Sequence, residues 1–162
     1  MHWYRYGALR RDTSASERAL NIAITMFTPC FINDIDPLPE PLLPILADQA
    51  APIAVDLFDS AFAAPDEAYL RVAIRLLQRI LAIRPADRLS RPAMLSMLGI
   101  ALSNLSERTG DQATLDEAVD ALREAAAAIP ADDAAHAETL SNLGNALRKR
   151  FELTIQRQRL PQ

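Results

Sequence analysis

The chain has 162 residues, half of them hydrophobic and 23% charged, which is enough for one globular domain with a substantial apolar core. Its net charge of −4 argues against nucleic acid as a partner, because phosphate binding requires a basic surface. The single cysteine, Cys30, excludes an internal disulfide and is typical of a protein of the reducing cytosol. We expect Cys30 to act as a small, buried apolar residue.

The N-terminal third is predicted to be helical but irregular, with helices over His2–Arg11 and Ser16–Phe27. No secretory signal is visible. The longest apolar run, Ala19–Ile32, is interrupted by polar residues and is shorter than the roughly 20 residues that a membrane-spanning helix needs. We therefore expect a soluble, cytoplasmic protein with no membrane partner.

Four prolines fall within the nine residues Asp36–Pro44, which predicts an extended connection with no regular helix or central strand. Leu38, Leu42 and Leu43 are expected to pack this connection against the helices around it. A proline-rich recognition segment is the alternative interpretation. A further helix is predicted over Asp48–Phe62.

A gapless internal repeat of 45 residues begins at Asp66. Asp66–Gly110 aligns with Asp111–Ile155, and 17 of the 45 positions are identical, so the second half is a tandem copy of one supersecondary unit. The motif Leu95-x2-Leu98-Gly99-x2-Leu102 recurs as Leu140-x2-Leu143-Gly144-x2-Leu147, and Ala73-x3-Leu77 recurs as Ala118-x3-Leu122. Stacked units of this kind build binding surfaces more often than catalytic pockets.

The repeat region is predicted to be helical throughout, giving about seven helices in the whole chain. The apolar spacing and the breakers Pro85, Gly110 and Pro130 place helices over about 66–84, Ser90–Arg108, Thr114–Ile129 and Asp133–Leu153. Ser90 is the predicted cap of the second of these helices, and Gly110 is predicted to take a left-handed conformation.

Two glycines lie inside predicted helices at equivalent repeat positions, Gly99 and Gly144. Glycine costs about 1 kcal/mol relative to alanine in a helix, so their recurrence predicts a close helix–helix contact at each. Replacement of Gly144 by leucine is therefore expected to destabilise the fold.

These motifs resemble the tetratricopeptide repeat (TPR), although the connections are longer and leucine replaces the usual aromatic residues. The segment Leu140–Glu152 also resembles the long-unit repeats of large bacterial proteins that often end in a CHAT domain, a caspase-like cysteine protease. The resemblance implies an all-α, TPR-like α-solenoid of stacked antiparallel helical hairpins. We expect the chain to form one such domain over residues 1–162, with degenerate units in 1–65, two repeats in 66–155 and a tail in 156–162.

The resemblance implies a protein–protein interaction module or scaffold that binds a peptide or protein on a concave helical surface. The alternative is a truncated regulatory or sensor fragment of a larger repeat protein, such as a CHAT protease or a repeat-bearing transcriptional activator. In such arrays the first helix of each hairpin lines the concave surface. The side chains expected in the groove lie off the apolar stripe of these first helices: Ser96, Ile100, Ser103, Asn104, Ser141, Asn145, Arg148 and Lys149. The basic run Arg148–Arg150 is otherwise explained as a solvated C-terminal turn that complements the helix dipole.

Catalysis is not expected. Thiol catalysis would need a dyad of Cys30 and His2, and the sequence around these residues resembles no nucleophile motif. The sequence also contains no metal-ligand spacing and no phosphate-binding loop. His136 is expected to be exposed, and Asp132–Asp133 and Asp116–Glu117 to be carboxylates at helix starts. We therefore predict neither a catalytic residue nor a cofactor nor a metal.

Both ends resemble truncated parts of the repeat family. The helix over Asp133–Leu153 is expected to have no following helix to cover four apolar residues: Leu143, Leu147, Phe151 and Leu153. Exposed apolar helix faces associate with partners, so we expect a homo-oligomer formed through a terminal helix. The alternative is that a separate protein supplies the missing helices.

Overall fold

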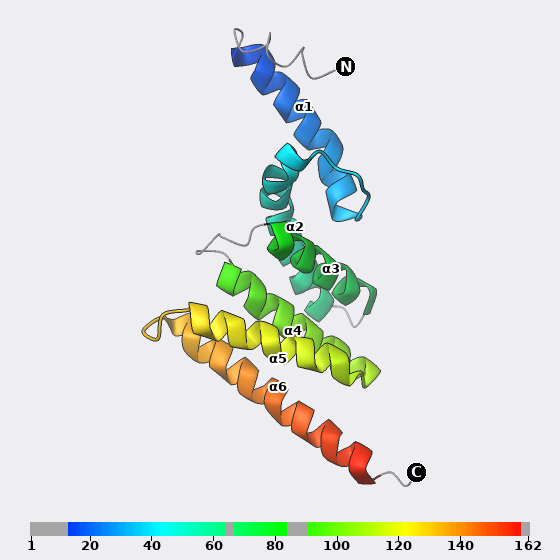
Figure 1. Cartoon of the computed structure of the whole chain (residues 1–162), viewed down its shortest axis with the longest axis vertical. Helices are drawn as coiled ribbons and strands as arrows, with labels where there is room; N and C mark the ends of the chain where they lie inside the picture. The colour runs from blue at the N-terminus through cyan, green and yellow to red at the C-terminus, as the bar shows by residue number, and fades with distance from the viewer. Residues whose placement is uncertain (1–12, 64–66, 84–90, 160–162) are drawn as a thin grey trace. The chain divides into compact units, whose positions relative to one another are not determined.

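The computed structural model describes residues 13–63, 67–83 and 91–159, and these residues contain helices and no strand (Figure 1). The prediction of an all-α protein is confirmed. The predicted helix over His2–Arg11 and the predicted cap Ser90 lie outside the described residues. The observed order is α1 (Thr13–Ile32), a 3-10 turn η3 (Glu40–Leu42), α2 (Leu43–Ala63), α3 (Glu67–Ile83), α4 (Arg91–Thr109), α5 (Gln112–Ala128) and α6 (Ala134–Arg159).

The chain divides into two compact units, Met1–Ala50 and Ala51–Gln162, and the division falls inside α2. In the first unit α1 continues past Phe27 to Ile32, and Pro29 lies within the helix. Phe31 of α1 and Leu46 of α2 are fully buried. The prediction of one domain over the whole chain stays a prediction.

The proline-rich connection is shorter than predicted, because α2 begins at Leu43 and not at Asp48. Pro44 lies in the first turn of α2, where no backbone N–H is needed for the helix. Glu40–Leu42 forms a single 3-10 turn before it. The prediction that Asp36–Pro44 excludes regular helix is therefore wrong at its C-terminal end, while Leu38, Leu42 and Leu43 are half-buried.

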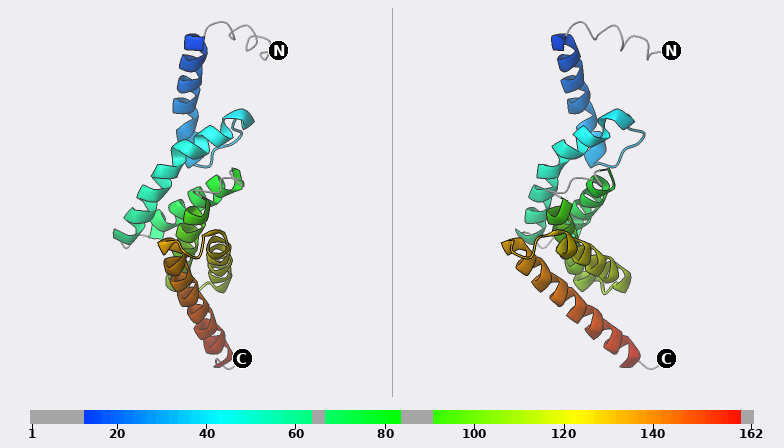
Figure 2. Two further views of the ribbon diagram at one scale, coloured as in Figure 1. Left: turned by 90° about the vertical axis from the view of Figure 1, so that its left-hand side faces the viewer. Right: turned by 60° about the vertical axis from the view of Figure 1, so that its left-hand side comes forward.

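In the second unit α3 packs against α4, α4 against α5, and α5 against α6. These last three helices alternate in direction along the chain (Figure 1), and Figure 2 shows α6 running on from them to the C-terminus. The packing repeats with the sequence, since each buried residue of α3 has a buried counterpart 45 positions later in α5. The α3 set is Leu70, Ala73, Ile74, Leu76, Leu77, Ile80 and Leu81, and the α5 set is Leu115, Ala118, Val119, Ala121, Leu122, Ala125 and Ala126.

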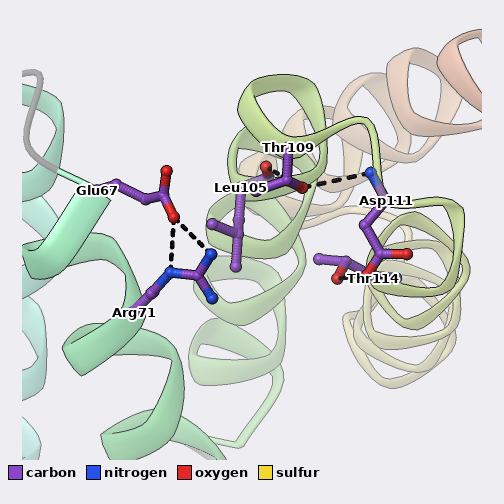
Figure 3. A network of polar contacts seen from close by, with 6 residues as sticks. All are labelled: Glu67, Arg71, Leu105, Thr109, Asp111 and Thr114. Atoms are coloured by element: carbon purple, nitrogen blue, oxygen red, sulfur yellow. Dashed lines mark hydrogen bonds and ion pairs between the residues drawn. The ribbon is translucent and has the colours of Figure 1, made fainter.

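A tight turn joins α4 to α5. Gly110 has a φ of 70°, which confirms its predicted left-handed conformation, and its N–H donates to Ser106 O at 2.7 Å. Asp111 caps α5 by accepting from Ala113 N at 3.1 Å and Thr114 N at 3.4 Å. Figure 3 shows the surrounding network, in which Thr109 Oγ1 donates to Leu105 O at 2.9 Å and Thr114 Oγ1 donates to Asp111 Oδ2 at 2.6 Å, with the Glu67–Arg71 ion pair of α3 nearby.

The two helix glycines have different surroundings. A Cβ atom at Gly99 would lie 2.5 Å from Leu122 Cγ and 3.0 Å from Ala118 O, so the predicted close contact between α4 and α5 is confirmed. A Cβ atom at Gly144 would meet nothing within 4 Å in the described part of the chain. The prediction of a close contact at Gly144 is wrong, because no described helix lies against Gly144 as α5 lies against Gly99.

Arg91 connects three helices at the start of α4. Its Nη1 donates to Leu81 O of α3 at 3.0 Å, and its Nε and Nη2 donate to Glu124 Oε1 of α5 at 3.1 and 2.9 Å. A guanidinium suits this position because its five N–H donors can bond to acceptors on two different helices at the same time. The contacts fix the N-terminal end of α4 against both neighbours.

Candidate functional site

A groove of about 600 Å³ lies between the N-terminal half of α4 and the beginning of α6, within the second unit. It is open to solvent, and the α5–α6 connection and one side chain of α2 complete it. Its lining consists of Phe58, Pro92, Ala93, Ser96, Met97, Ile100, Ala128, Ile129, Pro130, Asp133, Ala135, Glu138 and Thr139.

Helical spacing places the α4 residues of the groove on one side of that helix. Pro92, Ser96 and Ile100 recur every four residues and therefore lie above one another on the helix surface. Ser96 Oγ and Thr139 Oγ1 are 3.3 Å apart, and this hydrogen bond joins α4 to α6. Thr139 is only 2% exposed, so the bond also satisfies a hydroxyl that would otherwise be buried without a partner.

The α5–α6 connection is held by local hydrogen bonds that shape one end of the groove. Asp133 caps α6 by accepting from Ala135 N at 2.9 Å, which agrees with its predicted place at a helix start. His136 is half-buried, and its Nδ1 lies 3.1 Å from Ile129 O. The prediction of an exposed His136 is wrong, because the connection folds back so that the ring can bond to the backbone of Ile129.

The chemistry of the groove is apolar with acidic groups beside it. Most of its lining side chains are aliphatic, proline or aromatic, and the only ionisable side chains among them are Asp133 and Glu138. None of the lining residues that the structure describes is basic. The arrangement can hold an apolar side chain and favours positive over negative charge next to it.

A second, smaller hollow of about 160 Å³ lies at the C-terminal ends of α4 and α6. Lys149 Nζ lies 2.9 Å from Glu107 Oε2 across it, so the cation is already paired within the chain. Its lining consists of Ser103, Ser106, Glu107, Gly110, Leu115, Lys149, Glu152, Leu153 and Gln156.

The eight residues predicted for the groove do not share one surface. Ser96 and Ile100 line the larger groove, whereas Ser103 and Lys149 line the smaller hollow. Asn104 is half-buried and its Nδ2 donates to Ile100 O at 2.9 Å. The remaining three are exposed on α6: Ser141, Asn145 and Arg148, the last paired with Glu152 at 2.7 Å.

The reason for this separation is the path of α6 along α4. Ser96 lies opposite Thr139 and Glu107 lies opposite Lys149, so α6 covers part of the face that was expected to be open. Ser103 is consequently only 8% exposed. The residues of the connection, such as Ile129 and Pro130, were missed because helical periodicity carries no information about the path of a loop.

The basic run Arg148–Arg150 has a different role from the predicted last turn of a helix. The helix α6 continues to Arg159, so the run lies well before its C-terminus. Lys149 pairs with Glu107 of α4, and Arg150 lies 3.6 Å from Asp116 of α5. Two of the three cations therefore bridge helices.

Of the Cys30–His2 pair considered for catalysis, the structure describes only Cys30. Cys30 is half-buried in α1, with its Sγ 3.9 Å from Met26 O, and His2 lies outside the described residues. Within residues 13–63, 67–83 and 91–159, no three His, Cys, Asp or Glu side chains gather where they could hold a metal ion. One helical segment, Glu40–Ala63, is long and apolar enough to cross a membrane, which is weak evidence because core helices of soluble proteins share this character.

Comparison of the chain with protein-family models, curated proteins and solved structures gave no match.

Proposed function

We propose that this chain is a TPR-like α-solenoid of stacked antiparallel hairpins that acts as a protein–protein interaction module. The observation that supports the fold is the equivalence of α3 and α5, whose seven buried positions coincide after a shift of 45 residues. Repeats that pack in register build extended binding surfaces and need no catalytic centre. The proposed protein is cytoplasmic and non-enzymatic, needs no cofactor and binds neither nucleic acid nor membrane.

The groove between α4 and α6 is the proposed binding site, and its apolar, open lining is the observation that carries the proposal. Met97 and Ile100 offer an apolar surface that a side chain of a partner would cover. Glu138 lies at the same groove and favours a basic residue on that partner. The partner is therefore a peptide or protein segment with an apolar anchor next to lysine or arginine.

A random peptide library displayed on phage tests the proposal directly. Wild-type protein is expected to enrich peptides that have an apolar anchor beside a basic residue, and their Kd is measured by fluorescence anisotropy. Ile100→Glu places a charge in the apolar groove and is expected to raise Kd more than about tenfold, a loss typical of a central interface residue. Glu138→Lys is expected to weaken the basic peptides selectively.

The matched control is Ala113→Glu, which adds the same charge at an exposed position of α5 outside the groove. It is expected to leave Kd unchanged. Circular dichroism of each variant checks that the helices persist. A library that enriches nothing above background, or peptides that bind Ile100→Glu as tightly as wild type, would contradict the groove proposal.

The alternative function is a regulatory or sensor part of a larger repeat protein, such as a CHAT protease or a repeat-bearing transcriptional activator. The observation that favours it is the apolar face of α6, which is equivalent to a covered face of α4 and is suited to a further repeat. A neighbouring gene that encodes such a protein, and a change in its activity when this chain is added, would support this function. An unrelated neighbourhood and an unchanged activity would count against it.

A further inference from the structure

The outer faces of α3 and α5 carry opposite charges at equivalent positions of the repeat. On α3 a basic residue recurs at every fourth position, and we call these three residues the arginine ladder: Arg71, Arg75 and Arg79. The residues 45 positions later on α5 are all carboxylates: Asp116, Asp120 and Glu124. The buried faces of the two helices correspond position by position. The charge of the outer face is therefore reversed between two helices that pack in the same way.

The carboxylates of α5 are used inside the chain. Glu124 lies 2.9 Å from Arg91 of α4, and Asp116 lies 3.6 Å from Arg150 of α6. The positions of these two arginines in the preceding copy hold Leu46 and Leu105, which are buried and carry no charge. The ion pairs that join α5 to its neighbours therefore have no counterpart for the arginine ladder.

The arginine ladder keeps an excess of positive charge at the surface. Arg71 Nε donates to Glu67 Oε1 of the same helix at 2.6 Å (Figure 3), yet the Arg71 side chain is still 54% exposed. Arg75, at the centre of the ladder, is exposed, and Arg79 is half-buried and also interacts within the chain. The other exposed residues on this side of α3 are neutral: Ala68, Gln78 and Ala82. One carboxylate, Glu67, thus faces three guanidinium groups on this helix.

We propose that the arginine ladder binds an acidic helix of another protein, in which carboxylates recur at every fourth residue. Four residues advance a helix by about 6 Å, so carboxylates at that interval meet the guanidinium groups in register. The carboxylates on α5 show that a helix presents such a series at this spacing. Each guanidinium can hold a carboxylate through two parallel hydrogen bonds, which makes the pairing specific in geometry as well as in charge.

A separate protein fits the ladder better than a second copy of this chain. The α5 carboxylates at the two ends of the series, Asp116 and Glu124, already pair with arginines of their own chain. A second copy would have to break these pairs in order to dock α5 on the ladder. Nucleic acid is disfavoured as the partner by the net charge of −4.

The arginine ladder is separate from the groove proposed above. None of its three residues is among the residues that line the groove, and α3 contributes no residue to that lining. The two surfaces also select opposite charges, because the ionisable groups at the groove are Asp133 and Glu138. The inference consequently stands or falls independently of the proposed peptide site.

The probe for the ladder is a synthetic, alanine-rich helical peptide of about 15 residues with glutamates four residues apart. Fluorescence anisotropy at about 50 mM salt measures its Kd for the full chain, and this Kd is expected to rise as salt screens the exposed charges. Arg75→Glu is expected to raise Kd about fivefold or more, whereas Arg75→Lys keeps the charge and is expected to retain most of the binding. Arg108→Glu is the matched control, because Arg108 is an exposed arginine of α4 outside the ladder, and it is expected to leave Kd unchanged.

A second peptide of the same composition, with its glutamates two residues apart and so on opposite sides of the helix, tests the register. It is expected to bind about threefold or more weakly than the first. Circular dichroism confirms that each protein variant keeps its helices. Equal binding of the two peptides, no binding of the first at low salt, or equal effects of Arg75→Glu and Arg108→Glu would each overturn the proposal. A wild-type dimer in sedimentation equilibrium that Arg75→Glu dissociates would assign the ladder to a second copy and would overturn it too.

Discussion

At the scale of single residues, the two helix glycines show that a repeated residue does not guarantee a repeated role. Gly99 is required by its neighbour, since Leu122 and the backbone of Ala118 leave no space for a side chain. Gly144 lacks that neighbour within the described chain. The sequence predicted the same role for both because the alignment reveals equivalent positions and cannot reveal whether a second helix lies against each one.

Gly99→Ala is expected to destabilise the protein. The added methyl group would lie 2.5 Å from Leu122 Cγ, and Leu122 is fully buried and cannot move aside without disturbing the core. Overpacking of this kind costs about 1–3 kcal/mol, which exceeds the gain of up to about 1 kcal/mol in helix propensity. A thermal melt should show a lower Tm, and a Tm equal to that of wild type would refute the packing role.

Gly144→Ala is the matched comparison and is expected to have the opposite sign. The position is open, so the variant gains helix propensity without a clash and is expected to be more stable by up to about 1 kcal/mol. Chemical denaturation at low protein concentration measures this difference in the monomer. A marked loss of stability there would show that Gly144 is packed after all, as the sequence had suggested.

At the scale of helices, the sequence predicted the elements well and their ends less well. The apolar period of α3 and α5 is strong because a helix buried along one stripe needs that spacing, and both helices were correctly placed. The start of α5 was predicted two residues late, since Asp111 had not been recognised as its cap. The end of α6 was predicted too early because its last turns carry few apolar residues.

The cap at Asp111 is expected to contribute measurably to stability. Its carboxylate accepts from two backbone N–H groups and from the Thr114 hydroxyl at the start of α5. Loss of such a cap costs about 1 kcal/mol, so Asp111→Ala should lower the free energy of unfolding by roughly that amount. Asp111→Asn keeps a capping oxygen and is expected to retain most of the stability. Equal urea midpoints for wild type and Asp111→Ala would contradict this role.

The ion pair between Lys149 and Glu107 is expected to couple α6 to α4 only weakly. The Lys149 side chain is 25% exposed and the Glu107 side chain 60% exposed, so solvent screens the interaction. A double-mutant cycle with Lys149→Met and Glu107→Gln should give a coupling of about 0.2–1 kcal/mol that falls at high salt. No measurable coupling at low salt would show that the pair adds nothing to the contact between the helices.

At the scale of the whole molecule, the candidate site is harder to predict than the fold. Ser96 and Ile100, which were expected to bind a partner because they lie off the apolar stripe of α4, line the larger groove, while their role in binding stays a prediction. Phe58, Pro130 and Thr139 come from α2, the α5–α6 connection and α6, and only the packing of these elements brings them together. The periodicity of a sequence describes one helix at a time. It therefore cannot predict a site that is built from several helices and a loop.

Hydrogen exchange should show where stability is concentrated in the second unit. Both α4 and α5 are packed between two helices, whereas α6 packs mainly against α5 and keeps Leu140 and Phe151 exposed among the described residues. Buried amides of α4 and α5 are therefore expected to exchange most slowly, and those near Thr154 at the end of α6 fastest. Mass spectrometry at low protein concentration tests the order, and equal protection of all three helices would contradict it.

The equivalence of α3 and α5 also means that the chain could be lengthened by whole blocks of 45 residues. If a further copy of 66–110 were inserted after Gly110, the original α4 would meet a copy of α3 in place of α5. The residues against Gly99 would be unchanged in type, because Ala73 and Leu77 correspond to Ala118 and Leu122. Gene duplication could therefore lengthen this protein in steps of 45 residues without any new solution to the packing of its core.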